Sequence, residues 1–482
     1  SPMYDLLVIG DDLASHVSAA YAAQNGLKTL LIAESGLGGL QVLGDFVFNL
    51  DAMPLSGFGT GQLGLSILEQ LEIPLPEEAA VFPDPAYQIV LPEHRIDFSG
   101  NLSLLKTEFA REFPEFETEI SAHFDMTVEA SSTFQNWMEN HPEIQPRSFR
   151  EYIDYLKIYP DIFKYKYGII AFDRILSQNA SLEKVWEAQQ ALLSFNLHDM
   201  FSFAAAFQYC SPLRGVSYFS SGKQFLFNAL IEKLESKEGL YLPHHGLESL
   251  THSKTIELEL KAPDGKMLHT SGQNCIFSNK SGQLPRIFGQ KKFIHLSDWF
   301  RPAKILYYPF TLFLGLPAKC LPEQMARHIA VVPDVSKDLY DNNLIILETS
   351  LPEKDKPLSV SLTSVSATVY LPNDPQLWTT EALHLEARNL VDRLEFFLPF
   401  FKENILFMDI DQSIDISMNY RGILNPKYDV RNAFLTSFSA KSHKTRFPNI
   451  FLTGSSLLSD AGFDAEMISG RNAARQIINQ RR

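Results

Sequence analysis

Residues 4–15 read Tyr4-Asp5-Leu6-Leu7-Val8-Ile9-Gly10-Asp11-Asp12-Leu13-Ala14-Ser15, an apolar run that ends in a glycine turn. An alanine-rich stretch follows up to Gly26, and a second apolar run covers residues 29–33 before Glu34. Short apolar runs bounded by turns predict buried strands, and the alanines between them predict a helix. The segment therefore predicts a β-α-β unit and, with it, a Rossmann-type α/β fold.

The turn keeps only part of the glycine pattern G-x-G-x-x-G, which lets a backbone approach a dinucleotide diphosphate. Gly10 fills the first position, but Asp12 stands at the second and Ser15 at the third. The charge of Asp12 repels a phosphate by about 4 kcal/mol per unit-charge pair at ~4 Å and an effective dielectric of ~20. Acids also cap helix N-termini, so we expect Asp11 or Asp12 to occupy the anion site. Ser15 is small enough to keep the helix close to the strand.

Two further features match a dinucleotide site. Glu34 lies about 20 residues past the turn, where a carboxylate usually binds a ribose hydroxyl. Capping of the strand end is the alternative role for this acid. A glycine cluster with Gly38 and Gly39 follows, and glycines let a chain pass close to a ligand.

Composition narrows the class of protein. The chain has 482 residues, 45% hydrophobic and 21% charged, which is enough for two or three folded domains. Its net charge of -15 argues against a nucleic-acid partner, because binding phosphates requires a basic surface. Cys210, Cys275 and Cys320 form no C-x-x-C pair, which favours a reducing, cytoplasmic location. The longest apolar stretch, residues 305–316, is too short to predict a membrane span.

Periodicity and turn signals divide the chain into five segments. We expect residues 1–100 to form the first part of a nucleotide-binding domain and residues 101–215 a mostly helical substrate or cap region. Residues 216–302 are expected to return to the nucleotide-binding domain with a hairpin, and residues 303–425 to form a strand-rich substrate domain with a helix. Residues 426–482 are expected to add the last strand and helix of the nucleotide-binding domain. We expect helices at residues 104–113, 120–138, 149–159, 182–207, 222–238, 380–399 and 464–479. We expect the strands of the second domain at residues 305–314, 343–349, 358–369 and 407–416.

Three separated segments carry a resemblance to a known family. The first is the β-α-β unit with its glycine pair. The second is Gly215-Val216-Ser217-Tyr218-Phe219-Ser220-Ser221-Gly222-Lys223, followed by a helix and a hairpin. The third is Asn449-Ile450-Phe451-Leu452-Thr453-Gly454-Ser455, followed by the last helix. Together they resemble the phytoene-desaturase-like branch of the FAD-dependent amine-oxidase superfamily. The resemblance implies an FAD/NAD(P)-type Rossmann domain with an inserted helical and antiparallel-sheet substrate domain.

The same segments depart from the family at positions that hold the cofactor. Family members carry an acid directly after the glycine of the terminal motif, where it holds the flavin ribityl chain, whereas Ser455 stands here. The central glycine pair is reduced to Ser221-Gly222. Together with Asp12, these changes remove FAD contacts and leave the fold-determining residues in place. If FAD is retained, the resemblance assigns its binding to Gly10, Asp12, Ser15, Glu34, Gly38, Gly39, Gly454 and Ser455.

Two functions follow from these observations. We favour a flavoprotein-fold protein that has lost FAD, uses no cofactor, and binds an apolar or isoprenoid-like molecule or a protein partner. The alternative is an FAD-dependent oxidoreductase, a desaturase, isomerase or saturase of a hydrophobic polyene-like substrate, in which the flavin supplies the chemistry. No residue can be assigned as a catalytic base, so enzymatic activity stays undecided.

An aromatic and basic cluster lies between residues 155 and 167. Its members are Tyr155, Lys157, Tyr159, Phe163, Lys164, Tyr165, Lys166 and Tyr167. Such side chains suit a lipid interface, and peripheral membrane docking, ordinary helix packing and a protein partner are the three alternatives. The phenylalanine-rich residues 195–207 likewise predict either a helical core or an apolar ligand cavity.

Two further clusters predict no metal site. Asp409, Asp411 and Asp415 would share one face of the strand expected at residues 407–416, where a solvated surface is the default interpretation. His244 and His245 predict an exposed turn, and the sequence offers them no partner at metal-ligand spacing.

Overall fold

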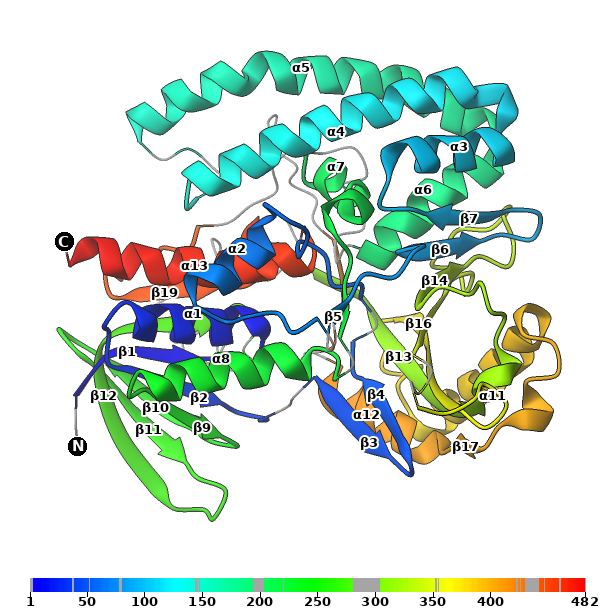
Figure 1. Cartoon of the computed structure of the whole chain (residues 1–482). Coiled ribbons are helices and arrows are strands. Elements are labelled where there is room, and N and C mark those ends of the chain that lie inside the picture. Colours follow the sequence, from blue (N-terminus) through cyan, green and yellow to red (C-terminus); the bar gives the residue numbers. More distant parts are fainter. Residues whose placement is uncertain are drawn as a thin grey trace.

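The computed structural model describes residues 3–36, 39–51, 53–77, 80–143, 146, 148–193, 203–219, 221–280, 304–351, 353, 355–421, 424, 426–429, 442–445, 447–458 and 461–481. Two large sheets lie side by side, and long helices cover them on one side (Figure 1). No helix in these ranges is both long enough and apolar enough to cross a membrane.

The first sheet contains the expected β-α-β unit. Its parallel strands follow the order β9 (Leu240–Pro243), β2 (Thr29–Ala33), β1 (Met3–Ile9), β12 (Met267–Ser278) and β19 (Ile450–Thr453). The register places Leu7 between Leu30 and Cys275, and all three side chains are buried. The first half of β12 pairs with β11 (Ile256–Lys261), which pairs with β10 (Gly246–His252). The strands predicted at residues 29–33 and 450–453 are thus confirmed.

Three helices pack beside this sheet: α1 (Leu13–Gln24), α8 (Gln224–Ser236) and α13 (Phe463–Gln480). α1 and α13 approach closely at Gly470, because this residue has no side chain. A Cβ there would lie 2.4 Å from the backbone oxygen of Ala14. The Ser18 hydroxyl donates a hydrogen bond of 2.6 Å to the Gly470 carbonyl. This contact brings the first turn of α13 next to the first turn of α1.

The second sheet is mostly antiparallel. Its order is β17 (Phe407–Met408), β13 (Lys304–Pro317), β16 (Leu362–Pro372), β15 (Ile345–Thr349), β14 (His328–Val331), β6 (Tyr87–Val90) and β7 (Arg95–Phe98), with β18 (Lys427–Asp429) also on β13. α11 (Thr380–Phe397) and α12 (Ile410–Tyr420) cover it with a shared apolar core that includes Leu383, Leu390 and Phe310.

Short elements near the N-terminus connect the two sheets. They are β3 (Leu40–Leu43), β4 (Phe46–Asn49), α2 (Leu63–Gln70) and β5 (Ala80–Val81), which pairs with β8 (Tyr218–Phe219). The β3–β4 hairpin packs on the second sheet, where the Phe48 and Phe313 rings lie 5.0 Å apart. Asn49, at the end of β4, therefore lies between the sheets.

The helical layer comprises α3 (Leu102–Glu112), α4 (Glu117–Asn140), α5 (Phe149–Gln178), α6 (Ala180–Leu193) and α7 (Phe203–Tyr209). α5 is much longer than the predicted helix at residues 149–159, because it continues through Pro160. Proline in a helix interior removes one hydrogen bond, but Pro160 lies on the exposed side. Ile162, Tyr165 and Ile169 beyond it are buried in the core shared with α4 and α7, which holds the second half of α5 in place.

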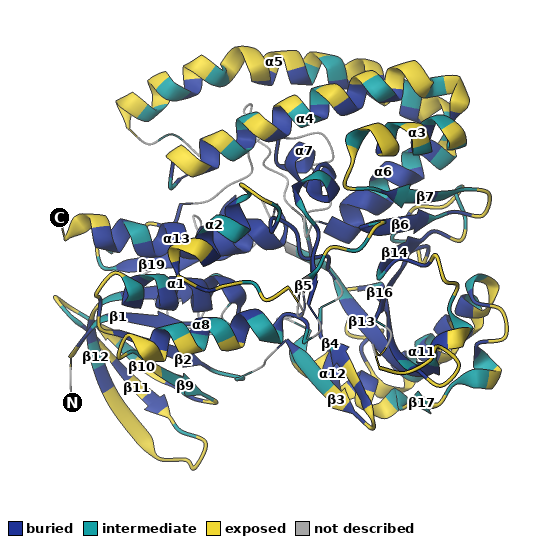
Figure 2. Cartoon of the chain, viewed as in Figure 1, coloured by how far each residue is buried: buried dark blue, intermediate teal, exposed yellow. Residues whose placement is uncertain are grey.

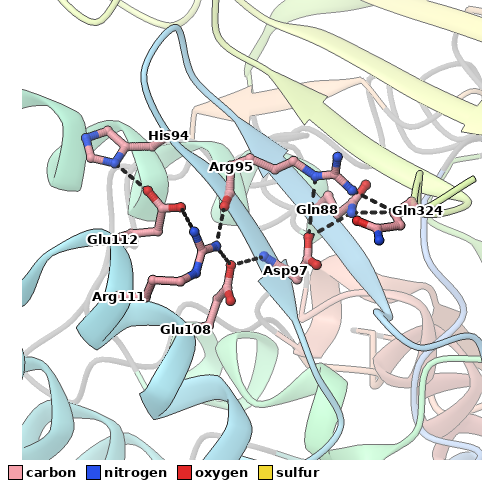
Figure 3. Close-up of polar contacts among 8 residues, drawn as sticks. All are labelled: Gln88, His94, Arg95, Asp97, Glu108, Arg111, Glu112 and Gln324. Carbon is pink, nitrogen blue, oxygen red and sulfur yellow. Dashed lines mark hydrogen bonds and ion pairs between the residues drawn. The ribbon is translucent and has the colours of Figure 1, made fainter. Parts of the chain in front are cut away.

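A polar network fastens α3 to β7 and β6 (Figure 3). Arg111 pairs with Glu108 at 2.5 Å, and Glu108 accepts a 3.3 Å hydrogen bond from the Asp97 backbone amide. The buried Gln88 amide donates to Asp97 and to the Gln324 carbonyl. The hairpin of the second sheet is thereby joined to the helical layer.

Two further secondary-structure predictions are wrong. Residues 407–416 were expected as one strand, but a two-residue strand is followed by α12, because Asp409 caps that helix by accepting from the Gln412 amide at 3.0 Å. The single helix expected at residues 182–207 is two helices, α6 and α7, and residues 194–202 lie outside the described ranges. Phe203 and Phe207 are buried in a core with Phe134, so the described part of the phenylalanine-rich stretch is helical core.

Candidate functional site

The first turn of α1 holds the glycine-motif positions. Asp12 is the N-cap: its Oδ1 accepts from the Ser15 backbone amide at 3.3 Å and from the Ser15 hydroxyl at 2.5 Å. Gly10 admits no side chain, since a Cβ there would lie 2.2 Å from Ser15 Oγ. The expected capping by Asp12 is confirmed, and the serine at the third glycine position supplies both donors.

A second carboxylate reaches the same helix end from the far end of the chain. Glu466, in the first turn of α13, accepts a 3.2 Å hydrogen bond from the Leu13 backbone amide. Burial raises the pKa of Glu466; nearby Lys280 opposes this shift and Asp12 adds to it. Burial alone would lower the pKa of Lys280, but Glu466 leads a group of negative charges that raises it instead. The helix end therefore faces two carboxyl groups, and Lys280 and Lys223 both act on Glu466.

The neighbouring strand end is joined to this turn. Asp11 Oδ1 accepts a 3.1 Å hydrogen bond from the Ser35 amide, directly after Glu34 at the end of β2. Burial raises the pKa of Asp11, although the Ser35 contacts oppose it. The structure thus places Glu34 next to the turn, as the β-α-β pattern requires, and its role in ribose binding stays a prediction.

The early glycine pair is described only in part. Gly38 lies outside the described residues. A Cβ on Gly39 would lie 2.8 Å from the Gln224 amide nitrogen, so Gly39 lets the chain pass against the start of α8. Lys223, just before α8, pairs with Asp51 at 2.5 Å.

The terminal motif lies at the end of β19. Gly454 has φ +140°, and a Cβ there would overlap the side-chain amide of Asn279. Its backbone amide donates to the Ser469 hydroxyl at 2.9 Å. Ser455 begins a short 3-10 turn, and its side chain lies outside the described ranges. Glycine is required here because the ends of β12 and β19 and the helix α13 converge.

A buried ion pair holds α13 in position. Arg214, from the turn before β8, pairs with Asp464, which has no exposed surface and also accepts from the Ser56 hydroxyl at 3.1 Å. The Arg214 guanidinium lies 3.4 Å from the centre of the Phe207 ring. Since Asp464 is two residues before Glu466, this pair fixes the turn from which Glu466 reaches α1.

A cleft of mixed polarity opens between the β3–β4 hairpin and the second sheet. It encloses about 750 Å³ of empty space, part of it open to solvent, and is lined by Asn49, Tyr218 and Glu348 among others. Glu348 pairs with His328 at 2.9 Å, and both are buried. The Asn49 amide donates to the other Glu348 oxygen at 2.5 Å.

Two smaller cavities continue this cleft inward. The next one shares Asn49, Tyr218 and Glu348 with the outer cleft and adds Met53 and Asp51. The third shares Met53 and Asp51 and holds about 400 Å³ of empty space, part of it open to solvent. Its apolar lining consists of Leu50, Met53, Leu192, Pro309, Ile346 and Leu424, and its polar lining of Asp51, Thr311, Thr368 and Tyr370. The cleft is thus of mixed polarity along its whole length.

The remaining sequence candidates are dispersed. Asp411 pairs with His384 at 2.7 Å on the helix surface. Within the described ranges, no three His, Cys, Asp or Glu side chains lie close enough together to hold a metal ion. His244 is exposed as expected, but His245 is buried, with Nδ1 2.6 Å from the Pro243 carbonyl, which corrects the prediction of an exposed pair. In the aromatic-basic cluster, only Tyr155 and Tyr165 are buried among its rings.

Sequence reasoning missed Glu466, Lys280 and the His328–Glu348 pair. Acids in the first turn of a helix ordinarily serve the helix dipole, so Glu466 gave no separate signal. Its partner, the Leu13 amide, is 453 positions away in the chain.

Comparison with known proteins supports the fold. No protein-family model and no curated protein matches the sequence. A putrescine oxidase triple mutant, made in a redesign of cofactor binding, is 13% identical with a TM-score of 0.63 and covers 99% of each chain. An oxidoreductase from Methanosarcina mazei is 12% identical with a TM-score of 0.59 and covers 98% of this chain and 100% of its own. Cyclohexylamine oxidase from Brevibacterium oxydans is 10% identical with a TM-score of 0.56 and covers 99% of each chain. The predicted fold class is confirmed: the chain shares the fold of these oxidases over nearly its whole length.

The residues at the start of α1 do not fit the diphosphate of FAD. That group needs the first amides of the helix as donors and a surrounding free of negative charge. The Ser15 and Leu13 amides donate to Asp12 and Glu466, and these two carboxyl groups would lie against the diphosphate. Lys280 and Lys223 are the positive charges that act on Glu466.

Proposed function

We propose that this chain is a ligand-binding protein with an amine-oxidase-type fold that does not bind FAD. One observation carries the proposal: carboxylates from Asp12 and Glu466 satisfy the helix amides that a dinucleotide diphosphate requires. A carboxylate charge at this helix end would repel each unit charge of the diphosphate by about 4 kcal/mol at ~4 Å and an effective dielectric of ~20. Lys280 and Lys223 oppose part of that repulsion.

The ligand in this proposal is an elongated molecule with an apolar body and a polar end. The apolar side chains of the inner cavity, among them Leu50, Met53 and Ile346, would contact an apolar or isoprenoid-like body, because burial of hydrocarbon surface favours binding. The outer cleft with Asn49 and Glu348 offers hydrogen bonds to a polar end. A protein segment inserted in the same cleft is the other occupant that fits this arrangement.

A second function is supported by the structural likenesses. The putrescine and cyclohexylamine oxidases match nearly the full length of the chain, and their common fold is one on which oxidoreductases are built. An FAD-dependent oxidoreductase acting on a hydrophobic polyene-like substrate is therefore the alternative. It requires Asp12 and Glu466 to release the α1 amides when FAD binds.

The absorption spectrum of the purified protein distinguishes the two functions. Under the main proposal, purified protein is colourless and leaves the fluorescence of added FAD unquenched. A yellow protein with near-stoichiometric flavin would refute it. A double variant, Asp12→Gly with Glu466→Ala, removes both acceptors and so frees both amides, and we expect it to bind FAD more tightly than wild type. Ser455→Asp alone is the control, since it leaves both carboxylates in place.

Ligand binding is tested with cis-parinaric acid, a fluorescent polyene fatty acid. We expect saturable fluorescence enhancement, reduced at least tenfold in affinity by Met53→Trp, which fills the passage between the two inner cavities. Met418→Trp, on the partly exposed surface of α12, is the matched control. Equal binding by wild type and Met53→Trp would remove the cleft as the site.

A further inference from the structure

α5 carries an apolar face that no other described element covers. It is the outermost helix of the molecule, and its outer edge is largely exposed (Figure 2). Phe149 is 82% exposed, Phe163 61% and Tyr167 76%. The exposed apolar side chains follow helical spacing along one stripe: Phe149, Tyr152, Leu156, Phe163, Tyr167 and Ile170. At ~1.5 Å per residue, the stripe is about 30 Å long.

Packing within the chain does not account for this stripe. The opposite face of α5, with Tyr155, Ile162 and Ile169, is already buried in the core shared with α4. Single exposed apolar residues are common, but a continuous apolar patch on a protein surface marks an interaction site. α5 is therefore apolar on two sides, and within the described residues only the inner side is packed against other elements.

Basic side chains run along one edge of the stripe. Arg150, Lys157 and Lys164 are spaced seven residues apart, nearly two helical turns, so they form one row. Asp154 and Asp161 each lie three residues before one of the two lysines. On the helix surface they are about 60° from the lysines, on the side away from the stripe. The positive charges thus stand between the apolar stripe and the acids, in a chain whose net charge is -15.

The lysines are available to an external anion. Their side chains are 73% exposed for Lys157 and 67% for Lys164. Lys157 lies 3.8 Å from Asp154 and Lys164 lies 3.3 Å from Glu129. Exposed ion pairs of this kind contribute little and exchange readily for other partners.

We propose that this face of α5 docks on an anionic membrane surface. An outermost amphipathic helix can lie along a lipid surface with its aromatic rings at the headgroup level. The row of basic side chains would then face lipid phosphates, to which lysine and arginine reach with their long apolar stems. Burial of the apolar stripe in the lipid surface favours binding, and the row of basic side chains favours anionic over neutral lipid.

The test is flotation of the full chain with vesicles of phosphatidylcholine alone or mixed with phosphatidylglycerol. We expect binding to the mixed vesicles, weakened by salt. Replacing Arg150, Lys157 and Lys164 by Gln should lower the partition coefficient by about fivefold per residue. Leu156→Glu with Phe163→Glu should abolish binding. Phe396→Glu, at a 92% exposed position on α11, is the matched control.

Three results would overturn the proposal. One is the absence of wild-type binding to the mixed vesicles. Another is equal binding by the Leu156→Glu/Phe163→Glu variant, whose changes are at exposed positions and leave the core intact. The third is a dimer in light scattering that this variant converts to a monomer, which would assign the face to a second copy of the chain.

Discussion

The Arg214–Asp464 pair should be among the most sensitive positions in the chain. Both side chains are buried, and Asp464 also accepts a hydrogen bond from Ser56. Asp464→Asn leaves the Arg214 charge without its counter-ion, and breaking a buried pair from one side costs about 3–5 kcal/mol. Unfolding entropy of about 2.1 cal/mol/K per residue gives roughly 1 kcal/mol/K for a chain of this length. The expected fall in Tm is therefore about 3–5 °C if the chain unfolds as one unit.

The assay is differential scanning fluorimetry supported by calorimetry. Asp125→Asn is the matched control, because Asp125 pairs with Lys106 at 2.6 Å but is 62% exposed, and such pairs contribute about 0–1 kcal/mol. Combining Asp464→Asn with Arg214→Met should recover part of the loss, since no buried charge is left unpaired. A Tm for Asp464→Asn within 1 °C of the control would refute the reasoning.

Three shorter predictions concern the same region and the cysteines. Burial raises the pKa of Glu466, so above the ordinary glutamate range the folded chain keeps a proton that the unfolded chain has released. Wild type should therefore lose stability relative to Glu466→Gln as pH rises through that range. A Tm difference between the two that does not change with pH would contradict this. Gly57→Ala should destabilise more than Gly61→Ala: both have positive φ, but only at Gly57 would the Cβ meet a side chain, at 2.7 Å, and equal urea midpoints would exclude that contact as the cause. Of the three thiols, only that of Cys320 should react with Ellman's reagent in the native chain, since the other two are buried with raised pKa values, and all three should react in guanidinium.

Local patterns predicted the parts of the fold whose partners are close in sequence. The strand at residues 29–33 and the cap at Asp12 follow from periodicity and turn chemistry within one β-α-β unit. The prediction failed at Pro160, where tertiary burial beyond the proline outweighs one lost hydrogen bond, and at Asp409, where a cap was read as a strand residue. Glu466 could not be found, because its effect depends on the close crossing of α1 and α13.

The start of α1 differs from a glycine motif by more than its missing glycines, because two carboxyl groups bind its amides. Loss of a glycine removes room for a diphosphate, whereas the Asp12 and Glu466 hydrogen bonds satisfy the same amides from within the chain. An unsatisfied helix end is unfavourable when buried, so these two hydrogen bonds stabilise the start of α1 without any ligand. Restoring a glycine at position 12 would leave the Leu13 amide donating to Glu466. Under the proposed loss of FAD, recovery of binding therefore requires a change in α13 as well as in the turn, and the double variant tests this where Asp12→Gly alone does not.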